Sequence, residues 1–290
     1  MRSSHQSPSN PSHKLLPLNY ERGNQFAQLV ELIEPSRERG ELFLSSQNNE
    51  ILDTILNEFR HADTLRRHGL TNRSKILLYG PPGCGKTFTA EILSRQTGLP
   101  LYVAKVDAII SSFLGETASN VRKLFDAANE RACVLFLDEF DALARARSSN
   151  DEHNELRRVV NSLLMMIDRY SGRGLLIAAT NLEDSLDSAI WRRFDDVLFL
   201  GLPRLAEIRT YLKFRTRNFP TDFNVEKKAS KLVGLSYADI ERVCLSGIKR
   251  TILGKSLRLK EKEFEAALSD EKRRHRAHAQ LKAKPATRRR

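Results

Sequence analysis

The sequence predicts an α/β fold, in which a three-layer domain built on a parallel sheet is followed by a small helical domain. Three observations lead to this prediction. Short apolar runs recur between residues 76 and 200 with segments of helical periodicity between them, and after Pro203 only the helical periodicity continues. The chain has 290 residues, 40% of them hydrophobic, which is enough to bury one large core and a smaller one.

The predicted strands are apolar on consecutive residues, which is typical of strands buried on both faces of a sheet. They are Ile76–Leu78, Leu101–Val106, Val134–Leu137, Leu175–Ala179 and Val197–Leu200. Between them, apolar residues repeat at helical spacing over 121–128 and 156–163. Because strands and helices alternate, we expect a parallel sheet with helices packed against it.

These patterns divide the chain into four parts. A polar arm precedes the α/β domain, a small helical domain follows it, and a basic tail comes last. The four parts cover residues 1–50, 51–202, 203–268 and 269–290. Within the helical domain the periodicity is clearest over 208–214, 225–233 and 238–248.

Most of the arm is predicted to be disordered, since residues 1–18 are rich in Ser, Pro, Asn and His and show no periodicity. Apolar residues between Phe26 and Ile33 predict a short helix that ends before Pro35. A further helix is predicted over Ile51–Phe59.

The net charge of +12 comes mostly from the tail. Residues 271–290 contain nine Lys and Arg against one Glu, which leaves +4 for the rest of the chain. Such a tail can bind nucleic acid or an acidic partner, although a solvated chain end is the simpler interpretation.

The composition also favours a cytoplasmic protein without a membrane partner. No apolar run approaches the roughly 18 residues of a spanning helix, and the N-terminus lacks the apolar centre of a secretory signal. Cys84, Cys133 and Cys244 are far apart and odd in number, which argues against disulfides and a zinc site.

The clearest motif is a glycine-rich loop between a predicted strand and a predicted helix. It reads Gly80-Pro81-Pro82-Gly83-Cys84-Gly85-Lys86-Thr87, and Phe88 follows it. Glycines let backbone N–H groups approach phosphates closely, and the helix dipole strengthens this anion site, which is called a P-loop. Lys86 suits the β and γ phosphates of ATP, and the Thr87 hydroxyl suits Mg²⁺. A glycine-rich turn without a ligand is the less common alternative.

Polar residues follow two of the later strands. Asp138 and Glu139 end one, and Asn181 follows another. In α/β sheets this edge is where ligands bind, so Asp138 can hold Mg²⁺ and Glu139 can activate a water for attack on the γ phosphate. Asn181 can orient that water if the two strands pair. Taken singly, each of these residues could simply belong to a turn.

The order of these motifs resembles the AAA ATPases, and among them the proteins that remodel other proteins. The resemblance covers roughly residues 51–268 and rests on the P-loop, Leu135–Glu139, Ala178–Asn181, Leu186–Ala189 and Arg193–Asp195. It implies that Asn181 is the first sensor of the family. It also implies that Arg192 and Arg193 are arginine fingers for the ATP of a neighbouring subunit, and we favour Arg193, which directly precedes Phe194.

Two further segments are interpreted through this resemblance. Residues 112–116 resemble a loop that projects into the central pore of a ring, where Phe113 and Leu114 would grip a polypeptide; the alternative is that Phe113 belongs to the core. Residues 234–239 resemble the segment that closes over the nucleotide, which places Ala238 beside it.

The resemblance therefore implies an ATP hydrolase that uses Mg²⁺, forms a homo-oligomeric ring of six subunits and remodels a protein substrate. The alternative is a nucleic-acid-associated AAA ATPase that uses the basic tail. The sequence contains no HExxH motif, so any proteolysis is expected from another chain.

Overall fold

The computed structural model describes residues 30–33, 41–106, 117–142, 154–181 and 188–283. Its α/β part is a six-stranded sheet with the order β1-β3-β4-β5-β2-β6. The strands are β1 (Glu31–Ile33), β2 (Lys75–Tyr79), β3 (Leu101–Lys105), β4 (Val134–Asp138), β5 (Leu175–Thr180) and β6 (Asp196–Phe199). Neighbouring strands are parallel except β1, which pairs antiparallel with β3. The five predicted strands are therefore confirmed.

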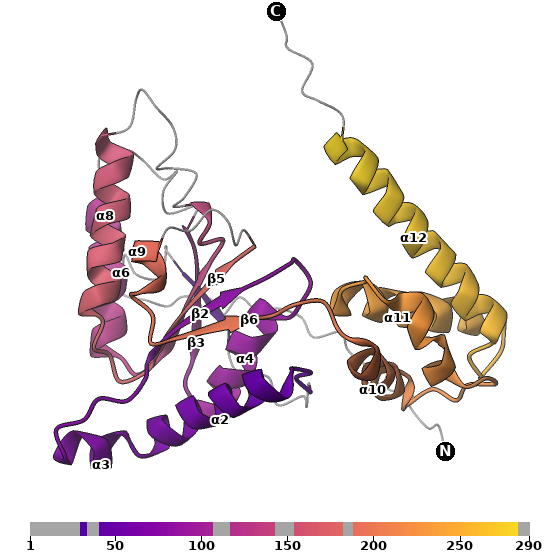
Figure 1. Ribbon diagram of the computed structural model, residues 1–290, viewed down its shortest axis with the longest axis horizontal. Coiled ribbons are helices and arrows are strands. Elements are labelled where there is room, and N and C mark those ends of the chain that lie inside the picture. The colour runs from indigo at the N-terminus through magenta and orange to yellow at the C-terminus, as the bar shows by residue number, and fades with distance from the viewer. Residues whose placement is uncertain (1–29, 34–40, 107–116, 143–153, 182–187, 284–290) are drawn as a thin grey trace, which may run out of the picture.

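Helices cover both faces of this sheet (Figure 1). They are α2 (Ser46–Arg60), α4 (Lys86–Thr97), α6 (Thr117–Glu130), α8 (Asn154–Arg169) and the short α9 (Ser188–Trp191), while α3 (Ala62–Arg67) follows α2 and has no buried residue. Strand β4 shows how the sequence produces three layers. Val134 and Phe136 belong to the core that includes α2 and α4, whereas Leu135 and Leu137 belong to the core that includes α6 and α8. An apolar run on consecutive residues thus fills both faces.

A separate helical core lies beside the sheet (Figure 1). It is formed by α10 (Leu205–Thr216), the 3₁₀ helix η1 (Val225–Leu232), α11 (Tyr237–Leu253) and α12 (Glu261–Ala283). Ile208, Leu212, Ile240 and Phe264 are fully buried at its centre. None of the described helices is apolar enough over a sufficient length to cross a membrane.

The prediction of a helix before Pro35 is wrong for residues 30–33, the part of this segment that the structure describes. Glu31–Ile33 form the strand β1 instead. This segment pairs with the edge strand β3, so that its backbone groups form ladder hydrogen bonds at an edge that would otherwise be open. The next helix, α2, begins at Ser46, inside the predicted arm, because the hydroxyl of Ser45 accepts a hydrogen bond from the backbone N–H of Asn48.

The predicted basic tail begins as part of a helix, although its side chains from Lys272 to Ala277 are exposed. Helix α12 continues through residue 269 as far as Ala283. The reason is that polar side chains of α12 have partners on α11: Glu271 is only 5% exposed and forms an ion pair with Arg242. The helix is thereby fixed to α11 beyond Leu268, its last residue in the hydrophobic core.

Candidate functional site

The glycine-rich loop lies between β2 and the start of α4, and its backbone is tightly confined. A Cβ atom on Gly80 would overlap the carbonyl group of Leu200. Lys86, the first residue of α4, folds back over the loop and donates hydrogen bonds to the carbonyl oxygens of Gly80 (2.7 Å) and Pro81 (3.0 Å). The loop therefore directs both the lysine and the N-terminus of a helix to one place, which is an arrangement that attracts anions.

Lys86 carries the positive charge of this loop although it is only 8% exposed. Burial lowers the pKa of its ammonium group, and the carboxylates of Asp138 and Asp141 partly oppose this shift. Burial also raises the pKa of Cys84, which argues for a neutral thiol. An anion bound at the loop would favour the charged lysine further.

The carboxyl ends of β4 and β5 bring the other candidate residues to the loop. The two strands pair, as the interpretation of Asn181 requires, and β5 also pairs with β2, which leads into the loop. Glu139 follows β4 in a left-handed conformation with φ of 54°. Its backbone N–H donates to Oδ1 of Asp138 (2.8 Å), and the next N–H, of Phe140, donates to the carbonyl oxygen of Ala179 (2.9 Å).

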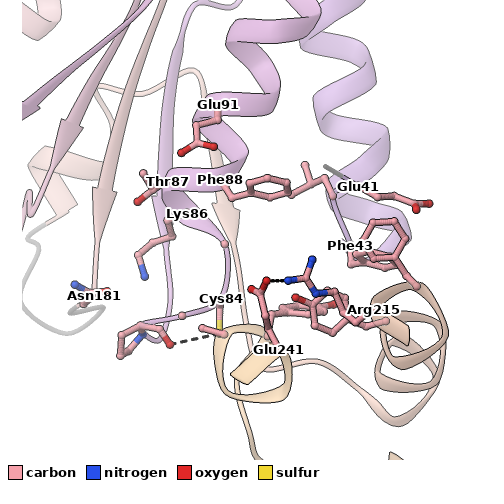
Figure 2. A pocket seen from close by; sticks show the side chains of 18 of the residues that line it. Glu41, Phe43, Cys84, Lys86, Thr87, Phe88, Glu91, Asn181, Arg215 and Glu241 are labelled. Carbon is pink, nitrogen blue, oxygen red and sulfur yellow. Dashed lines mark hydrogen bonds and ion pairs between the residues drawn. The ribbon is translucent and has the colours of Figure 1, made fainter. Parts of the chain in front are cut away.

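A cavity of about 790 Å³ lies between this edge of the sheet and the helical core (Figure 2). Its volume is in the range of about 300–1,000 Å³ that is typical of small-molecule sites. One end of the cavity is polar, and its lining includes Lys86, Thr87, Asp138, Glu139 and Asn181. In Figure 2, Lys86 and Asn181 lie together, away from Phe43 and Arg215.

The other end of the cavity is aromatic. Phe43, which precedes α2, has its ring centroid 5.1 Å from that of Tyr211 and 5.2 Å from that of Phe214. Tyr237 lies 5.0 Å from Tyr211. All four rings line the cavity. They bring the segment before α2 together with α10 and α11, and a flat apolar ligand group would suit this end.

Polar side chains surround the aromatic end. Arg215 of α10 and Glu241 of α11 form an ion pair at the cavity wall, drawn as a dashed line in Figure 2. Arg217 lies 4.1 Å from the ring centroid of Phe214. These groups can meet the polar rim of a ligand whose flat face is covered by the rings.

The helical core contacts the glycine-rich loop directly at the N-terminus of α11. The backbone N–H of Ala238 donates to the carbonyl oxygen of Gly83 (3.1 Å). A Cβ atom on Gly83 would lie 2.6 Å from the hydroxyl oxygen of Ser236, which is too close. Glycine at this position therefore lets the two segments meet.

Comparison with known proteins decides the family. Residues 76–202 match the family described as ATPase family associated with various cellular activities (AAA). The chain is 52% identical over 255 residues to an uncharacterized AAA family ATPase of Sinorhizobium fredii, which covers 88% of this chain and 77% of that protein. The chain belongs to the AAA ATPase family.

A more distant AAA relative is longer, and the match covers less than half of its length. This AAA chain is 35% identical over 199 residues to the ATP-dependent zinc metalloprotease FtsH 3 of Sphaerobacter thermophilus. The match covers 66% of this chain and 41% of the length of that relative.

The two arginines that the sequence singles out in this AAA ATPase do not line the cavity of their own chain. Nε of Arg193 lies 3.1 Å from Oδ2 of Asp168, and its guanidinium also donates to the carbonyl oxygen of Ala189. Arg192 is exposed.

Most of the other candidate residues of this AAA ATPase meet at the cavity. Those that line it are Pro82, Gly83, Cys84, Gly85, Lys86, Thr87, Phe88, Asp138, Glu139, Asn181 and Ala238. Gly80 and Pro81 lie behind them as acceptors for Lys86. Phe113 and Leu114 lie outside the described residues. The sequence analysis missed the aromatic end, although the apolar triplet Leu42-Phe43-Leu44 within a polar arm was a usable signal.

Proposed function

We propose that this chain hydrolyses ATP, with Mg²⁺ as cofactor, in the cavity between the glycine-rich loop and the helical core. The observation that carries the proposal is the convergence of Lys86, Asp138, Glu139 and Asn181 at one end of that cavity. A lysine at a helix N-terminus opposite two carboxylates suits a phosphate chain that carries a metal ion. Membership of the AAA ATPase family supports ATP as the ligand.

The chemistry of each polar residue suggests its part in the reaction. The oxygens of Thr87 and Asp138 are hard ligands that would hold Mg²⁺, and the ion neutralises charge on the β and γ phosphates. Lys86 would exchange its two carbonyl acceptors for phosphate oxygens. Glu139 would take a proton from the attacking water, and Asn181 would orient that water.

The aromatic end of the cavity is proposed to hold the adenine. Phe43 and Tyr237 belong to the cluster of rings on this wall, and aromatic faces stack on nucleobases. Ala238 contacts Gly83 and would close over the middle of the nucleotide. In this proposal the helical domain acts as a lid on the site.

We further propose that the active protein is a closed homo-oligomeric ring, with six subunits as the family resemblance implies. The support is that Arg192 and Arg193 lie outside their own cavity, while an arginine supplied by a neighbour stabilises the charge of the transferring phosphoryl group. For Arg193 to serve as that finger, its pair with Asp168 has to open. Head-to-tail contacts in a ring would give every site such a neighbour.

We propose that this ring works in the cytoplasm and remodels or unfolds a protein substrate through its central pore. Phe113 and Leu114 would grip the substrate in the central pore. The relative FtsH 3 is by its name an ATP-dependent metalloprotease, and the absence of an HExxH motif here limits our proposal to the ATP-driven step.

The proposal is tested by the rate of ATP hydrolysis as a function of protein concentration, for the wild type and for Arg193→Ala and Arg192→Ala. With a finger supplied in trans, the rate per subunit should rise with concentration as the ring assembles. The finger variant should lose roughly 10³-fold or more in rate, while its ATP affinity is retained. A rate per subunit that is flat, in a protein whose mass stays monomeric, would contradict the ring.

The alternative function is that of a nucleic-acid-associated AAA ATPase, and one observation favours it. Lys272, Arg273, Arg274 and Arg276 are exposed on α12. Replacing Lys272, Arg274 and Arg276 by Gln should then abolish a salt-sensitive binding to duplex DNA and leave ATP hydrolysis intact. If the wild type does not bind DNA at low salt, this alternative is removed.

A further inference from the structure

A cluster of charged side chains joins the C-terminal helix to the helix that touches the glycine-rich loop. Asp239 and Arg242 come from α11, and Glu271 and His275 come from α12, which packs along α11 (Figure 1). Asp239 and Glu271 are 8% and 5% exposed. Carboxylates are rarely so deeply buried unless they are paired, so the cluster depends on its partners.

Arg242 is the bridge between the two helices. Its Nε lies 2.9 Å from Oε2 of Glu271, and its Nη2 lies 2.6 Å from Oδ1 of Asp239. On the other side, Nε2 of His275 lies 3.1 Å from Oδ2 of Asp239 and 3.7 Å from Oε1 of Glu271. Both residues of α12 therefore act on the same carboxylate of α11.

Asp239 connects this cluster to the nucleotide cavity. Its Oδ2 accepts hydrogen bonds from the backbone N–H (3.0 Å) and the hydroxyl (2.6 Å) of Ser236. The backbone N–H of Asp239 donates in return to the Ser236 hydroxyl oxygen (3.3 Å), which completes the capping box of α11. Burial raises the pKa of Asp239, but hydrogen bonds from Ser236 and His275 outweigh it, so that the pKa lies below its ordinary value. The ionised carboxylate thus fixes Ser236, the residue whose hydroxyl faces Gly83.

The cluster is better explained as a mechanical link than as a metal site. Asp239, Glu271 and His275 do bring three potential ligand atoms within 4.8 Å of one another. However, the Asp239 oxygen nearest His275 already accepts two hydrogen bonds from Ser236, and Arg242 already supplies positive charge to both carboxylates. A divalent cation would have to compete with these partners.

We propose that α12 is a positioning element for the nucleotide site. Glu271 and His275 act through Arg242 and Asp239, and they hold the turn from Ser236 to Ala238 against Gly83. The inference rests on the proposed ATP site, and it adds that the C-terminal helix sets the affinity of that site from a distance. Anything that moves α12 should then change nucleotide binding, and nucleotide binding should in turn stabilise α12.

The test compares two neutralised glutamates on the same helix. Glu271→Gln should weaken the binding of fluorescent mant-ATP by roughly fivefold or more, which is the usual lower range of coupling between sites. Because the residues of the phosphate end are untouched, the KM for ATP should rise while kcat at saturation stays near that of the wild type. His275→Gln, at a side chain that is 45% exposed, serves as a second variant with less risk to folding.

Glu265→Gln is the matched control. Glu265 also belongs to α12 and forms ion pairs with Lys228 (2.8 Å) and Lys231 (2.7 Å) of η1, away from α11. The Glu265→Gln substitution should lower the melting temperature of the protein without changing its affinity for mant-ATP. Hydrogen exchange over residues 268–280 should slow on addition of ATP in the wild type and in Glu265→Gln, but not in Glu271→Gln.

The outcomes separate this inference from the proposed function. Equal losses of affinity in Glu265→Gln and Glu271→Gln would mean general loosening of α12 and would overturn the positioning proposal. So would wild-type affinity in both Glu271→Gln and His275→Gln. If the wild type itself does not bind mant-ATP, the proposed function fails, and the positioning proposal fails with it.

Discussion

Glu139 has a backbone conformation that is uncommon for a residue with a side chain. Its φ of 54° lies in the left-handed region, which costs an L-residue roughly 1–2 kcal/mol. Two hydrogen bonds hold it there, from its own N–H to Asp138 and from the N–H of Phe140 to the carbonyl of Ala179. Strain of this kind is often found at catalytic positions, where the fold fixes a side chain in a specific direction.

At this residue we predict that Glu139→Gln separates binding from hydrolysis. The amide keeps the size of the carboxylate but cannot take a proton from water, so the hydrolysis rate should fall by roughly 10²–10⁴-fold. Affinity for ATP should be unchanged. Phosphate release and mant-ATP binding measure the two properties, and a variant that hydrolyses at the wild-type rate would show that another group is the base.

Among the elements, the contact between the glycine-rich loop and α11 connects the two parts of the molecule. The N–H of Ala238 donates to the carbonyl of Gly83, and the Ser236 hydroxyl lies 2.6 Å from the position that a Cβ of Gly83 would occupy. Behind this contact, α11 is held by α12. The loop, α11 and α12 are therefore connected by one continuous set of contacts.

For the contact between the glycine-rich loop and α11, we predict that Gly83→Ala weakens ATP binding and that Gly98→Ala does not. Both glycines are left-handed, with φ of 76° and 71°, so both substitutions should cost roughly 1–2 kcal/mol of stability. A Cβ on Gly83 would also meet Ser236 Oγ at 2.6 Å, whereas one on Gly98 has no atom within 4 Å. Chemical unfolding and mant-ATP titration test both effects; equal affinities in the two variants would argue against a lid contact at Gly83.

In the whole molecule, the proposed catalytic groups lie in two different places, inside the cavity and outside it. Glu139 faces the cavity, while Arg192 and Arg193 lie outside it, with Arg193 paired to Asp168 of α8. A single subunit with this arrangement contains an incomplete site if the arginine is needed for hydrolysis. A ring in which each subunit faces the next in the same sense would complete every site.

For the assembly we predict that two inactive variants restore each other. Glu139→Gln lacks the proposed base but keeps Arg193, and Arg193→Ala has the reverse defect. In a mixed ring, an Arg193→Ala site beside a Glu139→Gln neighbour contains both groups, so ATP hydrolysis should return on mixing. The control is a triple variant that carries Lys86→Ala, Glu139→Gln and Arg193→Ala. It supplies neither the base nor the finger, so mixing it with either single variant should not restore hydrolysis. No recovery in the first mixture, with mixed rings verified by mass, would place the whole site in one subunit.

The sequence by itself determined those features that depend on local pattern. Consecutive apolar residues such as Val134–Leu137 predicted buried strands, and the spacing of Gly80–Thr87 predicted the anion site, because strand burial and loop geometry follow from neighbouring residues. The pairing of β4 with β5, on which the interpretation of Asn181 depends, is present, and both Asp138 and Asn181 line the cavity.

Only the tertiary structure decided which distant segments meet. Phe43 joins a cluster with Tyr211 and Tyr237, and Glu271 joins Arg242 and Asp239, although long stretches of sequence separate the partners. The edge of β3 turned a segment with helical periodicity into the strand β1. The physical reason is the same in each case: burial, pairing of charges and edge hydrogen bonds depend on neighbours in space, which local periodicity does not contain.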